Sequence, residues 1–106
     1  MILVRDEFQC EPGQAQVFVS RFKEMASSLE DQDAVKQVRI LTDLCGRFDT
    51  VVVEAEIESI DTYLAMMHAA FADADFQARQ AELGPAPYRS GSRTFYTIEA
   101  EYSLEQ

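Results

Sequence analysis

Two side chains in this sequence could carry out proton chemistry. His68 is the sole histidine, and histidine titrates near neutral pH, so it could act as a general base. It follows Leu64 by four positions, which places it beside the apolar stripe of a predicted helix. The structural alternative is a half-buried histidine with a local hydrogen bond. That alternative is favoured, because no nucleophile and no residue that would orient the imidazole can be identified.

Asp6 is the second candidate, because it interrupts a set of apolar residues that alternate along the first predicted strand. A carboxylate that faces a layer of helices is costly unless it is paired or hydrogen-bonded. Asp6 could therefore line a cavity between sheet and helices, or a local twist of the strand could turn it to solvent. The pattern by itself favours the twist.

A stripe of aromatic and methionine side chains suggests a ligand pocket. Tyr63, Met67 and Phe71 recur at helical spacing, and Tyr96 lies in the last predicted strand. Together they could line a pocket in which two hydroxyl groups orient a small apolar or aromatic ligand. Such stripes more commonly belong to plain core, and this alternative is favoured.

A third group combines charges of both signs with one aromatic side chain on a single predicted sheet face. Its members are Arg5, Arg39, Glu54, Glu56, Arg93 and Phe95. The group could bind a polar small molecule, or it could set the specificity of a contact between two copies of the chain. We favour the contact, since a two-fold axis places such a patch against its own copy.

The sequence contains no motif for a metal or a nucleotide cofactor. It has two cysteines and one histidine, and Cys10 and Cys45 do not form a C-x-x-C pair, so the ligands are too few for a zinc site. Neither a glycine-rich phosphate loop nor G-x-S-x-G nor H-E-x-x-H is present. We therefore expect no metal and no cofactor.

Length and charge restrict the class of protein. The chain has 106 residues, a net charge of −10 and 47% hydrophobic residues, which fits one globular domain over 1–106 whose end frays over 102–106. Such acidity disfavours nucleic acid and anionic membrane surfaces as partners. No stretch approaches the ~20 apolar residues of a membrane span, and the first residues have the pattern of a strand and not of a signal peptide. We expect a cytoplasmic protein with reduced cysteines.

Predicted strands and helices would position these candidate residues. Period-two patterns predict strands over Ile2–Cys10, Val35–Leu44, Phe48–Ile57 and Tyr88–Glu101. Apolar spacings of three and four predict helices over 14–29 and, after an N-cap at Ser59, over 60–83, with an interruption at 73–75 and a stop at Gly84. The order strand–helix–strand–strand–helix–strand predicts a ferredoxin-like α+β fold, in which one antiparallel sheet carries two helices on the same face.

These features resemble a known family. The element order, Pro12-Gly13 after the first strand and the hairpin sequence from Leu41 to Glu54 are similar to NIPSNAP-type domains of the dimeric α+β barrel superfamily, over residues 1–99. The resemblance implies a homodimer whose two sheets close into a barrel. The superfamily also contains cofactor-free monooxygenases and haem-degrading enzymes. The haem enzymes need an axial ligand, and His68 is the only histidine here.

Two functions from different classes are therefore alternatives. The first is a homodimer that binds a small molecule or serves as an interaction module. The second is a cofactor-independent monooxygenase of the antibiotic-biosynthesis type, acting on an aromatic or quinone-like substrate. The enzyme requires a deep cavity beside Tyr63, His68 and Tyr96, and a filled core there would leave the binding or interaction protein.

Overall fold

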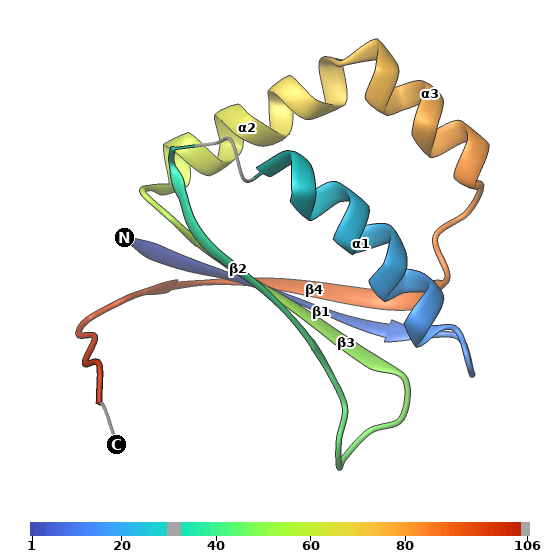
Figure 1. The fold of residues 1–106 in the computed structure, drawn as a ribbon, viewed down its shortest axis with the longest axis horizontal. Coiled ribbons are helices and arrows are strands. Elements are labelled where there is room, and N and C mark those ends of the chain that lie inside the picture. Colours follow the sequence, from blue (N-terminus) through green and yellow to red (C-terminus); the bar gives the residue numbers. More distant parts are fainter. Residues whose placement is uncertain (30–32, 105–106) are drawn as a thin grey trace.

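The strands and helices follow the predicted order. The computed structural model describes residues 1–29 and 33–104. Its elements are β1 (Ile2–Cys10), α1 (Ala15–Leu29), β2 (Val35–Thr42), β3 (Thr50–Ile57), α2 (Ile60–Ala72), α3 (Ala74–Leu83) and β4 (Tyr88–Thr97). The strands form one antiparallel sheet in the order β2-β3-β1-β4, and the helices lie over one of its faces (Figure 1). The predicted ferredoxin-like α+β architecture is confirmed.

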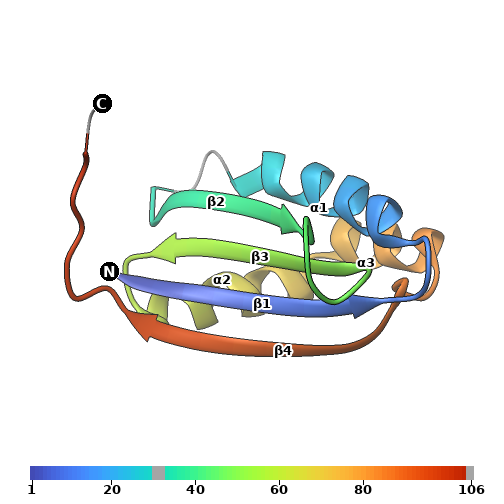
Figure 2. The same ribbon diagram turned by 90° about the horizontal axis from the view of Figure 1, so that it is seen from below.

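The helices leave the other face of the sheet uncovered. Figure 2 looks onto this surface, with the helices behind it. We call it the open face, and the opposite surface the helix face. Residues that face each other on neighbouring strands share a sheet face, so the strand register assigns to the open face Leu3, Arg5, Glu7, Gln9, Arg39, Leu41, Val52, Glu54, Glu56, Thr94 and Tyr96.

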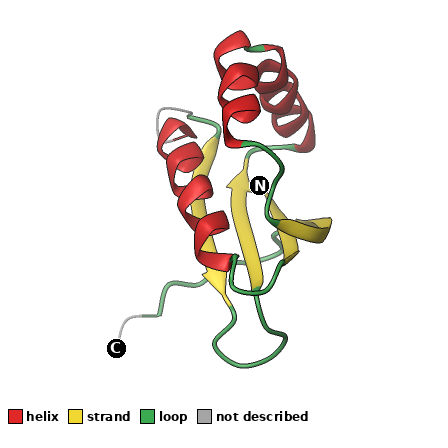
Figure 3. Ribbon diagram, turned by 90° about the vertical axis from the view of Figure 1, so that its right-hand side faces the viewer, coloured by secondary structure: helices red, strands yellow, loops and turns green. Residues whose placement is uncertain are grey.

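Two separate hydrophobic clusters attach the helices to the helix face. The buried members of the cluster beneath α1 are Cys10, Phe18, Val19, Val51 and Val53. Those of the cluster beneath α2 are Val4, Ile57 and Tyr63. Figure 3 likewise shows α1 apart from the α2–α3 pair. The core is therefore divided, and Asp6 lies on β1 between the two clusters.

The interruption predicted at 73–75 is a change of helix at Asp73. The Asp73 carboxylate accepts hydrogen bonds from the N–H groups of Asp75 (2.9 Å) and Phe76 (3.4 Å), so the residue that ends α2 also caps α3. The guanidinium of Arg21 in α1 donates to the carbonyl oxygens of Leu83 (2.9 Å) and Pro85 (3.2 Å). These contacts attach the end of α3 to α1.

The predicted strands are too long at three ends. β2 ends at Thr42, β3 begins at Thr50 and β4 ends at Thr97. Between β2 and β3 the Asp43 carboxylate accepts the Thr50 N–H at 3.1 Å, and Asp49 takes a positive φ of 57°. Local side-chain hydrogen bonds of this kind compete with the sheet ladder, so residues 43–49 form a projecting turn.

Some expectations fall on residues outside the described ranges. Residues 30–32, which follow the first predicted helix, lie outside these ranges, and the end expected to fray includes 105–106. The described residues 98–104 form neither helix nor strand. Within the described ranges, no helix is long and apolar enough to cross a membrane.

The prediction that Arg93 and Phe95 lie on the open face is wrong. Phe95 faces Val4 across the ladder, and Arg93 faces Asp6, so both side chains lie on the helix face. Alternation could not decide this, because the two faces of β4 each carry an aromatic residue, Phe95 on one and Tyr96 on the other. The register with β1 decides it.

Candidate functional site

The carboxylate of Asp6 lies on the helix face and is paired. Arg93 of β4 donates from Nε to Asp6 Oδ1 at 2.6 Å and from Nη2 to Oδ2 at 3.1 Å. This is the two-point geometry in which arginine binds a carboxylate most strongly. The strand therefore keeps Asp6 on the side of the helices, and the local twist to solvent favoured by the pattern does not occur.

Tyr63 of α2 covers the ion pair from above. The Arg93 guanidinium carbon lies 5.4 Å from the centre of the Tyr63 ring, a cation–π distance, and Phe95 meets the same ring edge-on at 5.5 Å. Burial raises the pKa of the Tyr63 phenol, Arg93 opposes this and Asp6 adds to it. The hydrogen bond to Asp6 is the main cause that raises the pKa of Arg93. The raised pKa keeps the Tyr63 phenol protonated at neutral pH, beside the ion pair of Arg93 with Asp6.

Next to the ion pair the helix face opens into a cleft of about 230 Å³, which we call the aromatic cleft. Its lining residues are Asp6, Phe8, Tyr88, Gly91, Ser92 and Arg93. Phe8 and Tyr88 contact each other with ring centres 5.0 Å apart. A Cβ atom at Gly91 would lie 3.0 Å from the Phe8 ring, so the absence of a side chain there gives the ring its place.

The aromatic cleft can hold a small ring compound that carries an oxygen. Phe8 and Tyr88 are aromatic lining residues, and Nη1 of Arg93 takes part in no hydrogen bond among the described residues. Because Asp6 already neutralises Arg93, the site favours an uncharged acceptor such as a carbonyl over a free anion. Its volume is below the ~300 Å³ at which pockets for drug-sized ligands begin, so the ligand would have one or two rings.

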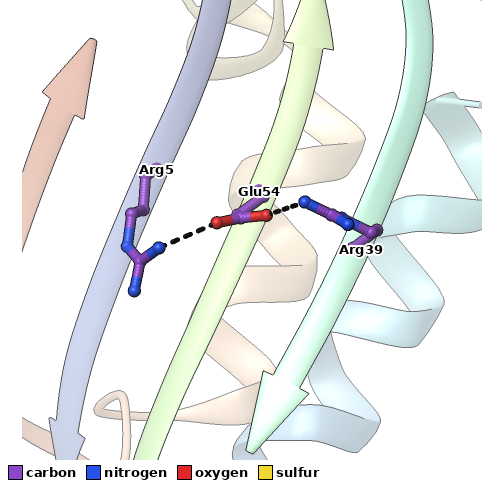
Figure 4. Close-up of polar contacts among 3 residues, drawn as sticks. All are labelled: Arg5, Arg39 and Glu54. Atoms are coloured by element: carbon purple, nitrogen blue, oxygen red, sulfur yellow. Dashed lines mark hydrogen bonds and ion pairs between the residues drawn. The ribbon is translucent and has the colours of Figure 1, made fainter. Parts of the chain in front are cut away.

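Three of the predicted charged residues meet on the open face. Arg5 Nη1 of β1 lies 3.0 Å from Glu54 Oε2 of β3, and Arg39 of β2 pairs with the other oxygen of Glu54 (Figure 4). Glu54 is only 5% exposed, although no helix covers it, because the two arginines shield it from either side. Glu56 shares the face, but forms no ion pair within the described part of the chain. Arg93 and Phe95 belong to the helix face.

The four residues proposed to line an apolar pocket do not come together. Tyr63 is buried in the cluster beneath α2, and Met67 packs against it. Phe71 is exposed and contacts Phe76 of α3, and Tyr96 lies on the open face. For Tyr63 and Met67 the structure agrees with the core alternative.

His68 stands apart from both candidate surfaces. It is exposed on α2, does not line the aromatic cleft, and lies across the sheet from Tyr96. The deep cavity that the monooxygenase alternative requires beside Tyr63, His68 and Tyr96 is therefore not formed by these residues. The position of His68 also does not fit an axial haem ligand, which has to point into a pocket. In the described part, no group of three or more His, Cys, Asp or Glu residues is placed to hold a metal ion.

Sequence reasoning missed Phe8, Tyr88 and Gly91 as lining residues. One signal was available, because a glycine inside a strand marks a place where another group approaches the backbone closely. The signal does not name that group. Only the register that sets Gly91 opposite Phe8 identifies it.

Comparisons with known proteins place this fold among known structures. Neither a family model nor a curated protein matches the sequence. An uncharacterized NIPSNAP domain protein from Burkholderia xenovorans is 17% identical over 99% of this chain and 100% of its own, with a TM-score of 0.74. A variant of MhuD with two manganese protoporphyrin IX molecules bound per active site is 12% identical over 98% and 100%, with a TM-score of 0.79. A variant of SnoaB, a cofactor-independent oxygenase from Streptomyces nogalater, is 17% identical over 94% of each chain, with a TM-score of 0.68.

At these low sequence identities, the structural similarity shows the fold. The chain is a ferredoxin-like α+β domain of the kind found in NIPSNAP domain proteins and in antibiotic-biosynthesis-type monooxygenases. The resemblance to NIPSNAP-type domains that the sequence carries is thus confirmed at the level of the fold.

Proposed function

We propose that this protein is a homodimer that binds a small aromatic or quinone-like molecule in the aromatic cleft of each protomer. The observation that carries the binding function is the Asp6–Arg93 ion pair, which lies beside the aromatic rings of the cleft and leaves Arg93 Nη1 available. One structure with this fold, that of a MhuD variant, holds manganese protoporphyrin IX. We assign no chemical step to the cleft, because it lacks a histidine and His68 is exposed on α2.

Binding can be tested with 1,4-naphthoquinone, which has two fused rings and carbonyl acceptors. We expect NMR titration of the ¹⁵N-labelled protein to shift the amide signals of 6, 8, 88 and 91–93. Arg93→Met should weaken binding by about tenfold, the usual value of one hydrogen bond from a charged donor.

Arg89→Met is the matched control for this titration. Arg89 lies on the same strand, but pairs with Glu11 at 3.0 Å and lies outside the aromatic cleft, so its removal should leave the affinity unchanged. Equal affinity of the Arg93→Met variant, or shifts located elsewhere, would contradict the proposed site.

The homodimer is proposed from the composition of the open face. Leu41 and Tyr96 are uncovered there, and three carboxylates accompany two arginines: Glu7, Glu54 and Glu56 with Arg5 and Arg39. Glu54 is already paired, while Glu7 and Glu56 form no ion pair in the described part of the chain. Two such faces related by a two-fold axis could pair the free carboxylates of one copy with the arginines of the other. Stacking would bury the uncovered side chains between two sheets about 10 Å apart.

Light scattering after size exclusion tests this association. We expect a mass near twice the 12.0 kDa of the chain. Leu41→Glu should reduce it to the monomer mass, because the added carboxylate would meet its own copy and other acidic groups across the axis.

Leu64→Glu is the control for the mass measurement. Leu64 and Leu41 are similarly exposed, at 46% and 40%, but Leu64 lies on α2, away from the open face. This variant should remain dimeric. A monomeric wild-type protein, or dissociation of the Leu64→Glu variant alone, would refute the proposed interface.

A further inference from the structure

The most exposed apolar side chains lie on two projections of the chain. Leu44 and Phe48, in the turn over 43–49, are 101% and 81% exposed, and Tyr102 and Leu104, in the segment 98–104, are 84% and 86% exposed. No other large apolar residue of the described chain exceeds 58%. Single exposed apolar residues are ordinary, but two pairs on two projections indicate a partner for each. We call the first projection the turn and the second the tail.

Hydrogen bonds and an ion pair hold both projections against the sheet. The Gln9 side chain, on the open face, donates to the Phe48 carbonyl at 2.6 Å. The tail begins with Ile98 N–H bonded to the Met1 carbonyl at 3.4 Å, and Glu101 lies 3.5 Å from Lys36 of β2. The tail therefore crosses the end of the sheet from the edge at β4 to the edge at β2. Figures 1 and 2 show the turn and the tail at opposite ends of the sheet, on the side away from the helices.

A second cleft lies beside the turn. This cleft of about 250 Å³, which we call the polar cleft, is lined by Glu7, Phe8, Gln9, Arg47, Thr50, Ser90, Gly91 and Ser92. The guanidinium of Arg47 has no ion-pair partner among the described residues. Arginine stacks readily on aromatic rings, and a tyrosine has an apolar ring with a polar tip. A tyrosine side chain therefore fits this cleft, because its hydroxyl can meet the polar walls while its ring contacts Arg47 and the exposed Phe48.

Each projection carries a charged side chain that the other could pair. The tail carries Glu99, which has no ion-pair partner in the described ranges, and Glu101, which lies 3.5 Å from Lys36. The turn carries the unpaired Arg47, while its acidic residues are engaged: Asp43 accepts the Thr50 N–H, and Asp49 accepts the Gly13 N–H at 3.1 Å. The turn as a whole has a formal charge of −1 from Asp43, Arg47 and Asp49, so its match to the acidic, apolar tail lies at the guanidinium of Arg47.

We propose that the tail of one copy docks on the turn of a second copy, with Tyr102 entering the polar cleft beside Arg47. The proposal rests on the homodimer proposed above. A two-fold axis that lies between the open faces and runs across the strands sets the tail end of each sheet against the turn end of the other, so the contact forms twice. Residues 98–104 span about 23 Å when extended, which exceeds the ~10 Å between stacked sheets.

Thiol cross-linking tests the contact directly. Cys45 is exposed at the turn, and Cys10 is buried, so the native protein offers one reactive thiol. Ser103→Cys places a second thiol between Tyr102 and Leu104. We expect a short bismaleimide to convert this variant to covalent dimer through Cys45 of one copy and position 103 of the other. Adding Phe48→Ser should slow the reaction by about tenfold, as expected if burial of one aromatic side chain is lost from the contact.

Three controls distinguish the outcomes. The wild-type protein should give no covalent dimer, since the turns lie apart, and Ser103→Cys combined with Cys45→Ser should give none, since the tails lie apart. Ser20→Cys, on α1, should not cross-link to Cys45. Covalent dimer in any of these three proteins would overturn the docking. A dimer by light scattering that does not cross-link through position 103 would overturn the docking and leave the homodimer, and a monomer would overturn both.

Discussion

Replacing Phe18 with alanine should lower the free energy of unfolding by about 3–4 kcal/mol. Phe18 is buried in the cluster beneath α1, where its ring centre lies 4.7 Å from Phe8 and 4.9 Å from Phe22. It also meets Tyr88 edge-on at 5.6 Å, so four rings from three elements share one contact. The substitution leaves a cavity beneath α1. Because the core is divided, the residues of the cluster beneath α2 cannot move in to fill it. Urea unfolding followed by circular dichroism, at one fixed protein concentration, measures the change.

Val17→Ala is the control for Phe18→Ala. Val17 is the preceding residue of α1 and is exposed, so its truncation should cost less than about 0.5 kcal/mol. The Phe18 variant should also lose binding of 1,4-naphthoquinone, because Phe8 and Tyr88 line the aromatic cleft and both pack on Phe18. Equal stability of the two variants would show that the ring cluster does not hold α1 to the sheet.

Replacing Glu54 with alanine should lower the free energy of unfolding by about 2 kcal/mol. The substitution removes the carboxylate that both Arg5 and Arg39 contact, and it leaves two cations on either side of one strand. Breaking a fully buried pair costs more than this, but the arginine side chains are partly exposed and can regain water. The loss should be measurable by the same urea titration.

Glu56→Ala separates the ion pairs from the general acidity of the chain. Glu56 is on the same strand and face, yet has no ion pair in the described part of the structure, so its loss should change the stability by less than about 0.5 kcal/mol. At a net charge of −10, removing any carboxylate relieves some repulsion. If Glu54→Ala were no worse than Glu56→Ala, the cluster with Arg5 and Arg39 would contribute nothing to stability.

Local sequence patterns were sufficient to predict the helices and strands, and insufficient to predict the residues at which the strands end. The N-cap at Ser59, whose side chain accepts the Thr62 N–H at 3.1 Å, and the change of helix at Asp73 depend on neighbours within a few residues, which the sequence displays. The strand ends at Thr42 and Thr97 depend on where partner strands and turn hydrogen bonds stop. Period-two alternation continues past those points without a signal.

The candidate site shows the same limit. Alternation correctly placed Asp6 on the apolar side of its strand, but it could not supply Arg93 as its partner, 87 positions away in the sequence. It also grouped Arg93 and Phe95 with the wrong face, because two aromatic residues adjoin in β4. Arg5, Glu54 and Arg39 were grouped correctly, since each sits in a strand whose two faces differ clearly in polarity.

By itself the amino-acid sequence determined the order of strands and helices, the ferredoxin-like α+β class and the charged character of one sheet face. Those properties follow from periodicities and caps that act over a few residues. The tertiary structure decided which face β4 turns to the helices, that Asp6 is paired under Tyr63, and that His68 and Tyr96 lie apart. It also decided that the turn and the tail project from opposite ends of the sheet. These depend on strand register, and a shift of one residue would exchange the two faces of a strand.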